Sequence, residues 1–165
     1  MDDTKMLWGR WILHLLRGFC LATAVLTAPA APAGDLAVVV HPDVSVSNLS
    51  LGEVRTILLG DRQYWSKDLR VTLLIRAPVA REREVVLKTI YQMSEAQFRQ
   101  YWISKVFRAE AASGPKIVYS SDTATELVAA IPGCITFMDV TQVPKGLKVL
   151  KINGRLPGEK GYLLH

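Results

Sequence analysis

The sequence predicts an α/β domain in which a largely parallel sheet is flanked by helices. Several short stretches have the length and the apolar content of β-strands, near residues 36–40, 71–75, 116–119, 134–137 and 147–152. Apolar residues at helical spacing fill most of the segments between them, and strands that alternate with helices are typical of a parallel sheet. Half of the 165 residues are hydrophobic, which is enough for one domain with a buried core.

The first strand and the first helix follow from residues 36–60. Leu-Ala-Val-Val-Val at 36–40 is a continuous apolar run, as expected for a strand covered on both faces. Ser50 and Glu53 fit a capping box, in which the serine hydroxyl accepts from the amide of residue 53 and the glutamate reaches back. The helix that begins there has an apolar face made of Leu51, Val54, Ile57 and Leu58. Gly60 is expected to end it.

The middle of the chain predicts a second strand and a second helix. Residues 71–75 form the strand, and a helix is expected from about residue 79 to residue 93. Its apolar face consists of Val85, Val86 and Ile90. Its solvated face consists of Arg81, Glu82, Arg83, Glu84 and Lys88.

A second capping box, Ser94 with Gln97, begins a third helix. The residues that this helix turns toward the core are Phe98, Tyr101, Trp102 and Val106. Aromatic side chains are more often packed in a core than used as a binding platform. Trp65 lies in a charged loop and is expected to cover the edge of the sheet.

The last third of the chain repeats the pattern of strand and helix. After the strand at 116–119, the residues suited to cap the next helix are Ser120, Ser121 and Asp122. That helix is expected over residues 123–130, and Pro132 with Gly133 turns the chain into the strand at 134–137. Residues 147–152 alternate apolar and polar side chains, which predicts an edge strand.

Residues 1–33 have the features of a secretory signal peptide, and residues 34–165 those of the folded domain. Basic residues precede a short apolar run, and small residues at alternate positions follow it. Cleavage is expected after Ala33, with Ala30 as the other choice. An uncleaved membrane anchor is the weaker interpretation, because Arg10, His14 and Arg17 interrupt the apolar stretch. The sequence therefore predicts a periplasmic or otherwise exported protein.

Composition and spacing argue against several classes of function. Removing residues 1–33 lowers the net charge only from +5 to +4, and no basic block with interleaved aromatics favours nucleic acid. Cleavage also removes Cys20 and leaves Cys134 in an apolar strand, where a buried, inert thiol is expected. No metal-ligand spacing, nucleophile elbow or paired carboxylates appear, and His41 has no obvious partner. We expect no enzyme activity, no metal and no cofactor.

Arg76 is the first candidate binding residue. In open α/β sheets, ligands bind at the carboxyl ends of strands, where helix N-termini offer free N–H groups. Arg76 ends the strand at 71–75, and a guanidinium suits a bidentate grip on phosphate or carboxylate. The candidates at the next strand end are Ser120, Ser121, Asp122 and Thr123. The alternative is that Arg76 lies on the surface and that these residues only cap a helix.

From about residue 36 to residue 164 the chain resembles the substrate-binding proteins of phosphate ABC transporters and the wider type-2 periplasmic-binding fold. The resembling pieces occur in the order of that family. They are the helix ending at Gly60, Trp65, the strand ending in Arg76-Ala77, Tyr101-Trp102, the turn and helix at 120–128, Pro132 to Phe137, and Gly161-Tyr162-Leu163-Leu164. The resemblance implies a periplasmic-binding-protein-like domain the size of a single lobe, with Arg76 matching the arginine that grips the anion.

The sequence also departs from that family. Where Ser-Gly-Thr would open the helix that wraps the anion, Ala80, Arg81 and Glu82 stand, and Glu82 would repel a phosphate if it pointed inward. The resemblance implies that the domain binds phosphate or another small oxyanion in a transport or sensing context, with a membrane transporter as partner. The departures keep a second hypothesis open, which is an envelope protein–protein interaction module that retained the fold and lost the ligand.

Overall fold

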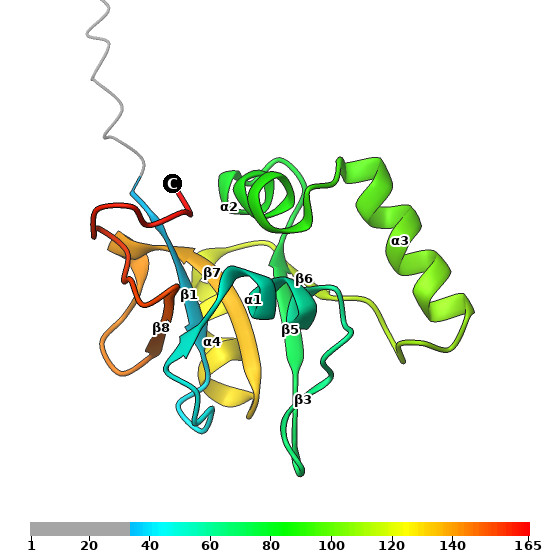
Figure 1. Ribbon diagram of the computed structural model, residues 1–165, viewed down its shortest axis with the longest axis horizontal. Coiled ribbons are helices and arrows are strands. Elements are labelled where there is room, and N and C mark those ends of the chain that lie inside the picture. Colours follow the sequence, from blue (N-terminus) through cyan, green and yellow to red (C-terminus); the bar gives the residue numbers. More distant parts are fainter. Residues whose placement is uncertain (1–33) are drawn as a thin grey trace, which may run out of the picture. The chain divides into compact units, whose positions relative to one another are not determined.

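The computed structural model describes residues 34–165 (Figure 1). The expected signal peptide, residues 1–33, lies outside the described residues. In the described part, six strands form one sheet in the order β2-β8-β1-β7-β5-β6. The bounds are β1 Leu36–Val40, β2 Asn48–Leu49, β5 Thr72–Arg76, β6 Lys116–Val118, β7 Cys134–Asp139 and β8 Lys148–Ile152. β1 runs antiparallel to β7 and β8, whereas β2 with β8, β5 with β6 and β5 with β7 pair in parallel. The expected α/β class is confirmed.

Two of the helices begin directly after the serines of the predicted capping boxes. Their bounds are α1 Leu51–Leu58, α2 Arg81–Val86, a π-helical segment Leu87–Tyr91, α3 Glu95–Phe107, α4 Ser121–Ala130 and a 3-10 turn Val140–Gln142. Both capping boxes form: the amide of Glu53 donates to Ser50 Oγ over 3.2 Å, and that of Gln97 donates to Ser94 Oγ over 3.3 Å. Gly60 follows α1 with a φ of 70°, a backbone conformation that glycine adopts without strain.

The helix expected from residue 79 starts later and has a different solvated face. Val79 adopts a φ of 70° and is exposed, so α2 begins only at Arg81. Arg83 was expected in solvent but is buried, because its guanidinium bonds to the Glu95 carboxylate and to a backbone carbonyl. In α3, Phe98 and Trp102 are buried as expected, but Val106 is exposed.

Two expectations about the sheet were wrong. Residues 64–70 form a small hairpin, β3 Tyr64–Ser66 with β4 Leu69–Arg70, where a loop was expected. Trp65 is a buried residue of this hairpin, and its indole Nε1 donates to the carbonyl of Gly133 over 2.8 Å. β8 is not an edge strand, because the short strand β2 pairs with its outer side.

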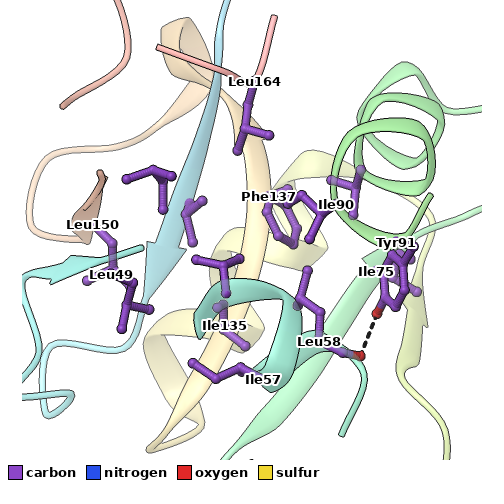
Figure 2. Packing of buried hydrophobic residues seen from close by; sticks show 14 of the residues in the cluster. Leu49, Ile57, Leu58, Ile75, Ile90, Tyr91, Ile135, Phe137, Leu150 and Leu164 are labelled. Carbon is purple, nitrogen blue, oxygen red and sulfur yellow. Dashed lines mark hydrogen bonds between the residues drawn. The ribbon is translucent and has the colours of Figure 1, made fainter. Parts of the chain in front are cut away.

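The core lies on both faces of the sheet. On one face, side chains of β1, β5, β7 and β8 pack against α1 and the π-helical segment (Figure 2). Phe98 and Trp102 of α3 belong to the same cluster. Figure 2 also shows Tyr91 reaching the end of α1, where its hydroxyl donates to the carbonyl of Leu58 over 2.8 Å. On the other face, alternate residues of the same strands pack against α4. Cys134 belongs to this second cluster, and burial raises the pKa of its thiol to about 12. Its expected burial is confirmed.

Replacement of Ser94 by alanine tests the second capping box. The variant loses the hydrogen bond from the Gln97 amide to the serine hydroxyl, and we expect the free energy of unfolding to fall by about 1 kcal/mol. Urea denaturation measures the change. Ser45→Ala is the control, since Ser45 lies exposed in a loop. Equal effects of the two replacements would contradict a capping role.

Candidate functional site

Arg76 lies at the carboxyl edge of the sheet, as predicted. It is the last residue of β5, it is aligned with Val118 at the end of β6, and the amide of Ala77 donates to the carbonyl of Val118 over 2.9 Å. The two parallel strands therefore end side by side. The Ser120 turn, which follows β6, begins next to the chain that leaves Arg76.

The guanidinium of Arg76 is largely buried and incompletely bonded. The side chain is 14% exposed, and its Nε lies 3.7 Å from Glu82 Oε1, whose side chain is 13% exposed. This distance is longer than a hydrogen bond. Nε and Nη1 of Arg76 are buried without any hydrogen-bond partner among the described residues. The backbone carbonyl of Arg76 accepts a hydrogen bond from Arg83 Nη1 of α2 over 2.9 Å.

The hydroxyls of the Ser120 turn already have partners, two of them within the turn and one in the 3-10 turn that follows β7. Ser120 Oγ accepts from the amide of Thr123 over 3.0 Å and lies 2.8 Å from Thr123 Oγ1. Ser121 Oγ donates to Gln142 Oε1 over 2.7 Å, while Asp122 is exposed. The structure thus brings this turn to the strand end beside that of Arg76. No hydrogen bond among the described residues joins Arg76 to it.

Arg81 has partners at the end of β7. Its Nη2 donates to the carbonyl of Gly34 over 2.8 Å, and its Nη1 lies 3.5 Å from Asp139 Oδ2. Asp139 also accepts from the amide and the hydroxyl of Thr141 and from the amide of Gly34. The hydrogen bonds from Thr141, with the nearby Arg81 charge, hold the pKa of the Asp139 carboxyl below its usual value. Sequence reasoning missed Asp139, although a carboxylate at the end of a buried strand could have signalled it.

Two concavities of residues 34–165 have no lining atoms from Arg76. One has a volume of about 280 Å³ and lies at the opposite end of β5 and β6, where Arg70, Thr72, Lys116 and Trp102 are among its lining residues. The other is an open groove of about 460 Å³ lined by the loop before α2, by α2 and by the start of α3. Neither is lined by Arg76 or by residues of the Ser120 turn.

Comparison with known proteins places this architecture. No family model matches the sequence. The structure is similar to that of an ABC-type phosphate transport receptor from Vibrio cholerae, with a TM-score of 0.60 and 17% identity over 78% of this chain and 53% of that chain. The described residues have a periplasmic-binding-protein-like α/β fold. The resemblance to substrate-binding proteins of phosphate ABC transporters is thereby confirmed at the level of the fold.

Two further structures with this fold are similar to the chain. One is the PstS protein from Borrelia burgdorferi, with a TM-score of 0.60 and 19% identity over 75% of this chain and 49% of that chain. The other is a putative phosphate ABC transporter substrate-binding protein with bound phosphate from Clostridium perfringens, with a TM-score of 0.59 and 16% identity over 73% of this chain and 46% of that chain. The chain spans about half the length of these structures.

Among residues 34–165, no helix is long and apolar enough to cross a membrane. In the same residues, no three or more His, Cys, Asp or Glu side chains gather where a metal ion could be held. His41 has a local partner, since its Nδ1 accepts from the amide of Asp43 over 3.1 Å.

Proposed function

We propose that the chain is an exported solute-binding domain that takes phosphate or another small oxyanion at Arg76, in a transport or sensing role. The fold supports a binding role over an enzymatic one, since the similar structures are named as transport receptors and substrate-binding proteins. One of them is named with bound phosphate. A membrane transporter is the partner that this role implies.

The observation that carries the proposal is the unmet hydrogen-bonding capacity of Arg76. Its Nε and Nη1 are buried and have no acceptor within the described residues. A buried donor without a partner costs roughly 1 to 3 kcal/mol, and more when it is charged. An oxyanion at this strand end would supply acceptors for both nitrogen atoms and balance the charge.

Glu82 competes with such a ligand. Its carboxylate lies within 4 Å of the guanidinium and is itself largely buried, so an anion must displace it to reach Nε. The nearby hydroxyls of Ser120, Ser121 and Thr123 already have partners, and each bond to the ligand would replace an existing one. The proposal is therefore of a weak site, in which an internal carboxylate partly occupies the place of the ligand.

Variants of Arg76 and Glu82 should change oxyanion affinity in opposite directions. Arg76→Ala removes a charge-assisted contact of about 1.5 to 3 kcal/mol, so we expect affinity for phosphate to fall more than tenfold. Glu82→Gln removes the competing charge at nearly the same volume, and we expect affinity to rise about tenfold, as for loss of one repulsive interaction of about 1.4 kcal/mol. Isothermal titration with phosphate, sulfate and acetate measures both.

The matched control is Glu126→Gln, an identical change at an exposed residue of α4. It should leave phosphate binding unchanged. If neither the unaltered chain nor Glu82→Gln takes up any of these anions at millimolar concentration, the Arg76 site is refuted.

A second candidate function is an envelope protein–protein interaction module. The observation that favours it is apolar surface on α3 and near β6, where Phe107 is 90% exposed, Tyr119 80% and Ile103 64%. α3 extends beyond the sheet (Figure 1), which leaves one side of the helix open. If isothermal titration detects no binding of phosphate, sulfate or acetate, this interaction role becomes the better-supported function.

A further inference from the structure

A cavity lies at the end of β5 opposite to Arg76. It is formed by the start of β5, the segment after α1, the loop before β6 and Trp102 of α3, and its volume is about 280 Å³. Small-molecule sites commonly start at about this size and combine an apolar wall with a few polar groups. Because β5 separates this cavity from the Arg76 guanidinium, the two places are independent.

Trp102 forms one wall of the cavity and lies against Gly60 and Gly114. A Cβ atom on Gly60 would lie 2.8 Å from the Trp102 ring, and one on Gly114 would lie 3.7 Å from Trp102 Cβ. The indole therefore packs closely against the backbone at Gly60, whereas a side-chain carbon at Gly114 would make only ordinary contact with Trp102. Together with Ile57 and Leu73, it gives the cavity an apolar floor. An apolar ligand body can displace water from such a floor.

The cavity is lined by cations and by no carboxylate. Arg62, Arg70 and Lys116 are among the lining residues, and none of the lining residues is Asp or Glu. The nearby acids have other partners: Asp61 pairs with Lys105, and Glu110 pairs with Arg108 over 2.6 Å. The local charge therefore favours an anion.

The three cations differ in how they are held. Arg62 is fixed, because its Nε donates to the carbonyl of Tyr64 over 3.2 Å, its Nη2 donates to that of Trp65 over 3.3 Å, and its guanidinium lies over the Trp65 ring. Arg70 and Lys116 are exposed and make no side-chain hydrogen bond or ion pair within residues 34–165. These two charges are thus free to bind an external group.

We propose that this cavity binds a small carboxylate with an apolar body, the chemistry of benzoate. The carboxylate lies between Arg70 and Lys116, and the ring packs on Trp102 and Leu73. A bare oxyanion such as phosphate would leave the apolar floor unused, and a neutral hydrocarbon would leave the cations without a partner. The cavity therefore selects for a ligand that has both parts.

Titration of the full chain with benzoate and two related compounds tests the ligand class. We expect benzoate to bind, and benzamide, which keeps the ring without the charge, to bind at least about tenfold more weakly. Acetate, which keeps the charge without the ring, should also bind at least about tenfold more weakly than benzoate. Affinity for benzamide equal to that for benzoate, or no heat with benzoate up to millimolar concentration, overturns the proposal.

Matched variants test the place. Arg70→Met and Lys116→Met keep an apolar stem and remove the charge, and each should weaken benzoate binding about fivefold, as for one partly exposed charge pair. Lys67→Met, at an exposed lysine of the same hairpin outside the cavity lining, should have no effect. An equal loss in all three variants would indicate a diffuse charge effect and refute the site.

The two proposed sites are separable in the same measurements. Arg76→Ala should leave benzoate binding unchanged, while Arg70→Met should leave phosphate binding unchanged. Benzoate should shift the amide resonances of Leu73 and Gly114 and not that of Ser121. Shifts confined to Ser121 and Ala77 would assign benzoate to the Arg76 end of β5 and overturn the proposal for the cavity.

Discussion

Replacement of Gly133 by alanine is expected to lower the free energy of unfolding by about 3 kcal/mol or more. Gly133 has a φ of 72°, and a Cβ atom there would lie 2.1 Å from the carbonyl oxygen of Arg70. The backbone has little freedom to relieve this clash, because the carbonyl of Gly133 accepts from the amide of Thr72 over 3.0 Å and from the Trp65 indole over 2.8 Å. Left-handed strain and overpacking each cost roughly 1 to 3 kcal/mol, and here both apply.

Gly146→Ala separates the clash from the backbone strain. Gly146 has a φ of 100°, and nothing lies within 4 Å of the position of its Cβ atom. This control should cost only the strain, about 1 kcal/mol. Urea denaturation of both variants gives the difference. If Gly133→Ala costs no more than Gly146→Ala, then the hairpin around Trp65 does not approach Gly133 as closely as the structure has it.

Gly133 also explains why the sequence did not predict the hairpin. The stretch from Tyr64 to Arg70 is mostly polar and short, and its buried residue, Trp65, has no periodic partner nearby in sequence. The partner is the carbonyl of Gly133, which is 68 residues away in the chain. Contacts at such separation leave no trace in local periodicity.

The main elements were predictable because their signals are local. A continuous apolar run gave β1, and two capping boxes gave the starts of α1 and α3 to within a residue. The position of β8 within the sheet has no local signal. Its alternating side chains suit an edge strand, but the two residues of β2 pair with its outer side. A two-residue strand carries no periodic signal of its own.

The position of Arg76 in the fold was predictable from the sequence, but its partners were not. The end of a buried strand located Arg76 at the carboxyl edge of the sheet, since every parallel strand directs its end there. The pairing of Arg76 with Glu82 depends on how α2 turns after the left-handed residue Val79. The basic cavity at the other end of β5 depends on Trp102 and on loops distant in sequence.

Replacement of Glu95 by alanine is expected to cost about 3 kcal/mol of stability and to loosen the backbone at Arg76. Arg83 is only 3% exposed, and its Nε and Nη2 each donate to the Glu95 carboxylate over 2.8 Å. Without Glu95, a buried guanidinium loses its counter-charge, which costs roughly 3 to 5 kcal/mol when both partners are fully buried. We take the lower end of that range, because the Glu95 side chain is 36% exposed and water can partly replace it.

Glu84→Ala is the matched control for this change. Glu84, like Glu95, is an acidic residue in the first turn of a helix, but it is exposed and forms no ion pair within residues 34–165. Its loss should cost no more than about 1 kcal/mol from helix-dipole effects. Arg83→Met combined with Glu95→Ala should recover part of the lost stability, because no unpaired charge then remains buried. A double variant as unstable as Glu95→Ala alone would contradict the buried-charge explanation.

The difference between the unaltered chain and Glu95→Ala should also depend on pH. The hydrogen bonds from Arg83 hold the pKa of the Glu95 carboxyl below its usual value. A carboxyl whose pKa is lowered by folding contributes stability above its unfolded pKa, about 4.3, and loses that contribution as pH falls through the folded pKa. The difference in free energy of unfolding between the two proteins should therefore be largest at pH 7, and this gap should narrow below about pH 4. Arg83 also donates to the carbonyl of Arg76. Replacement of Glu95 should therefore weaken the protection of the Arg76 and Ala77 amides from hydrogen exchange. A gap that stays constant down to pH 3 would mean that Glu95 stabilises the fold through packing and not through its charge.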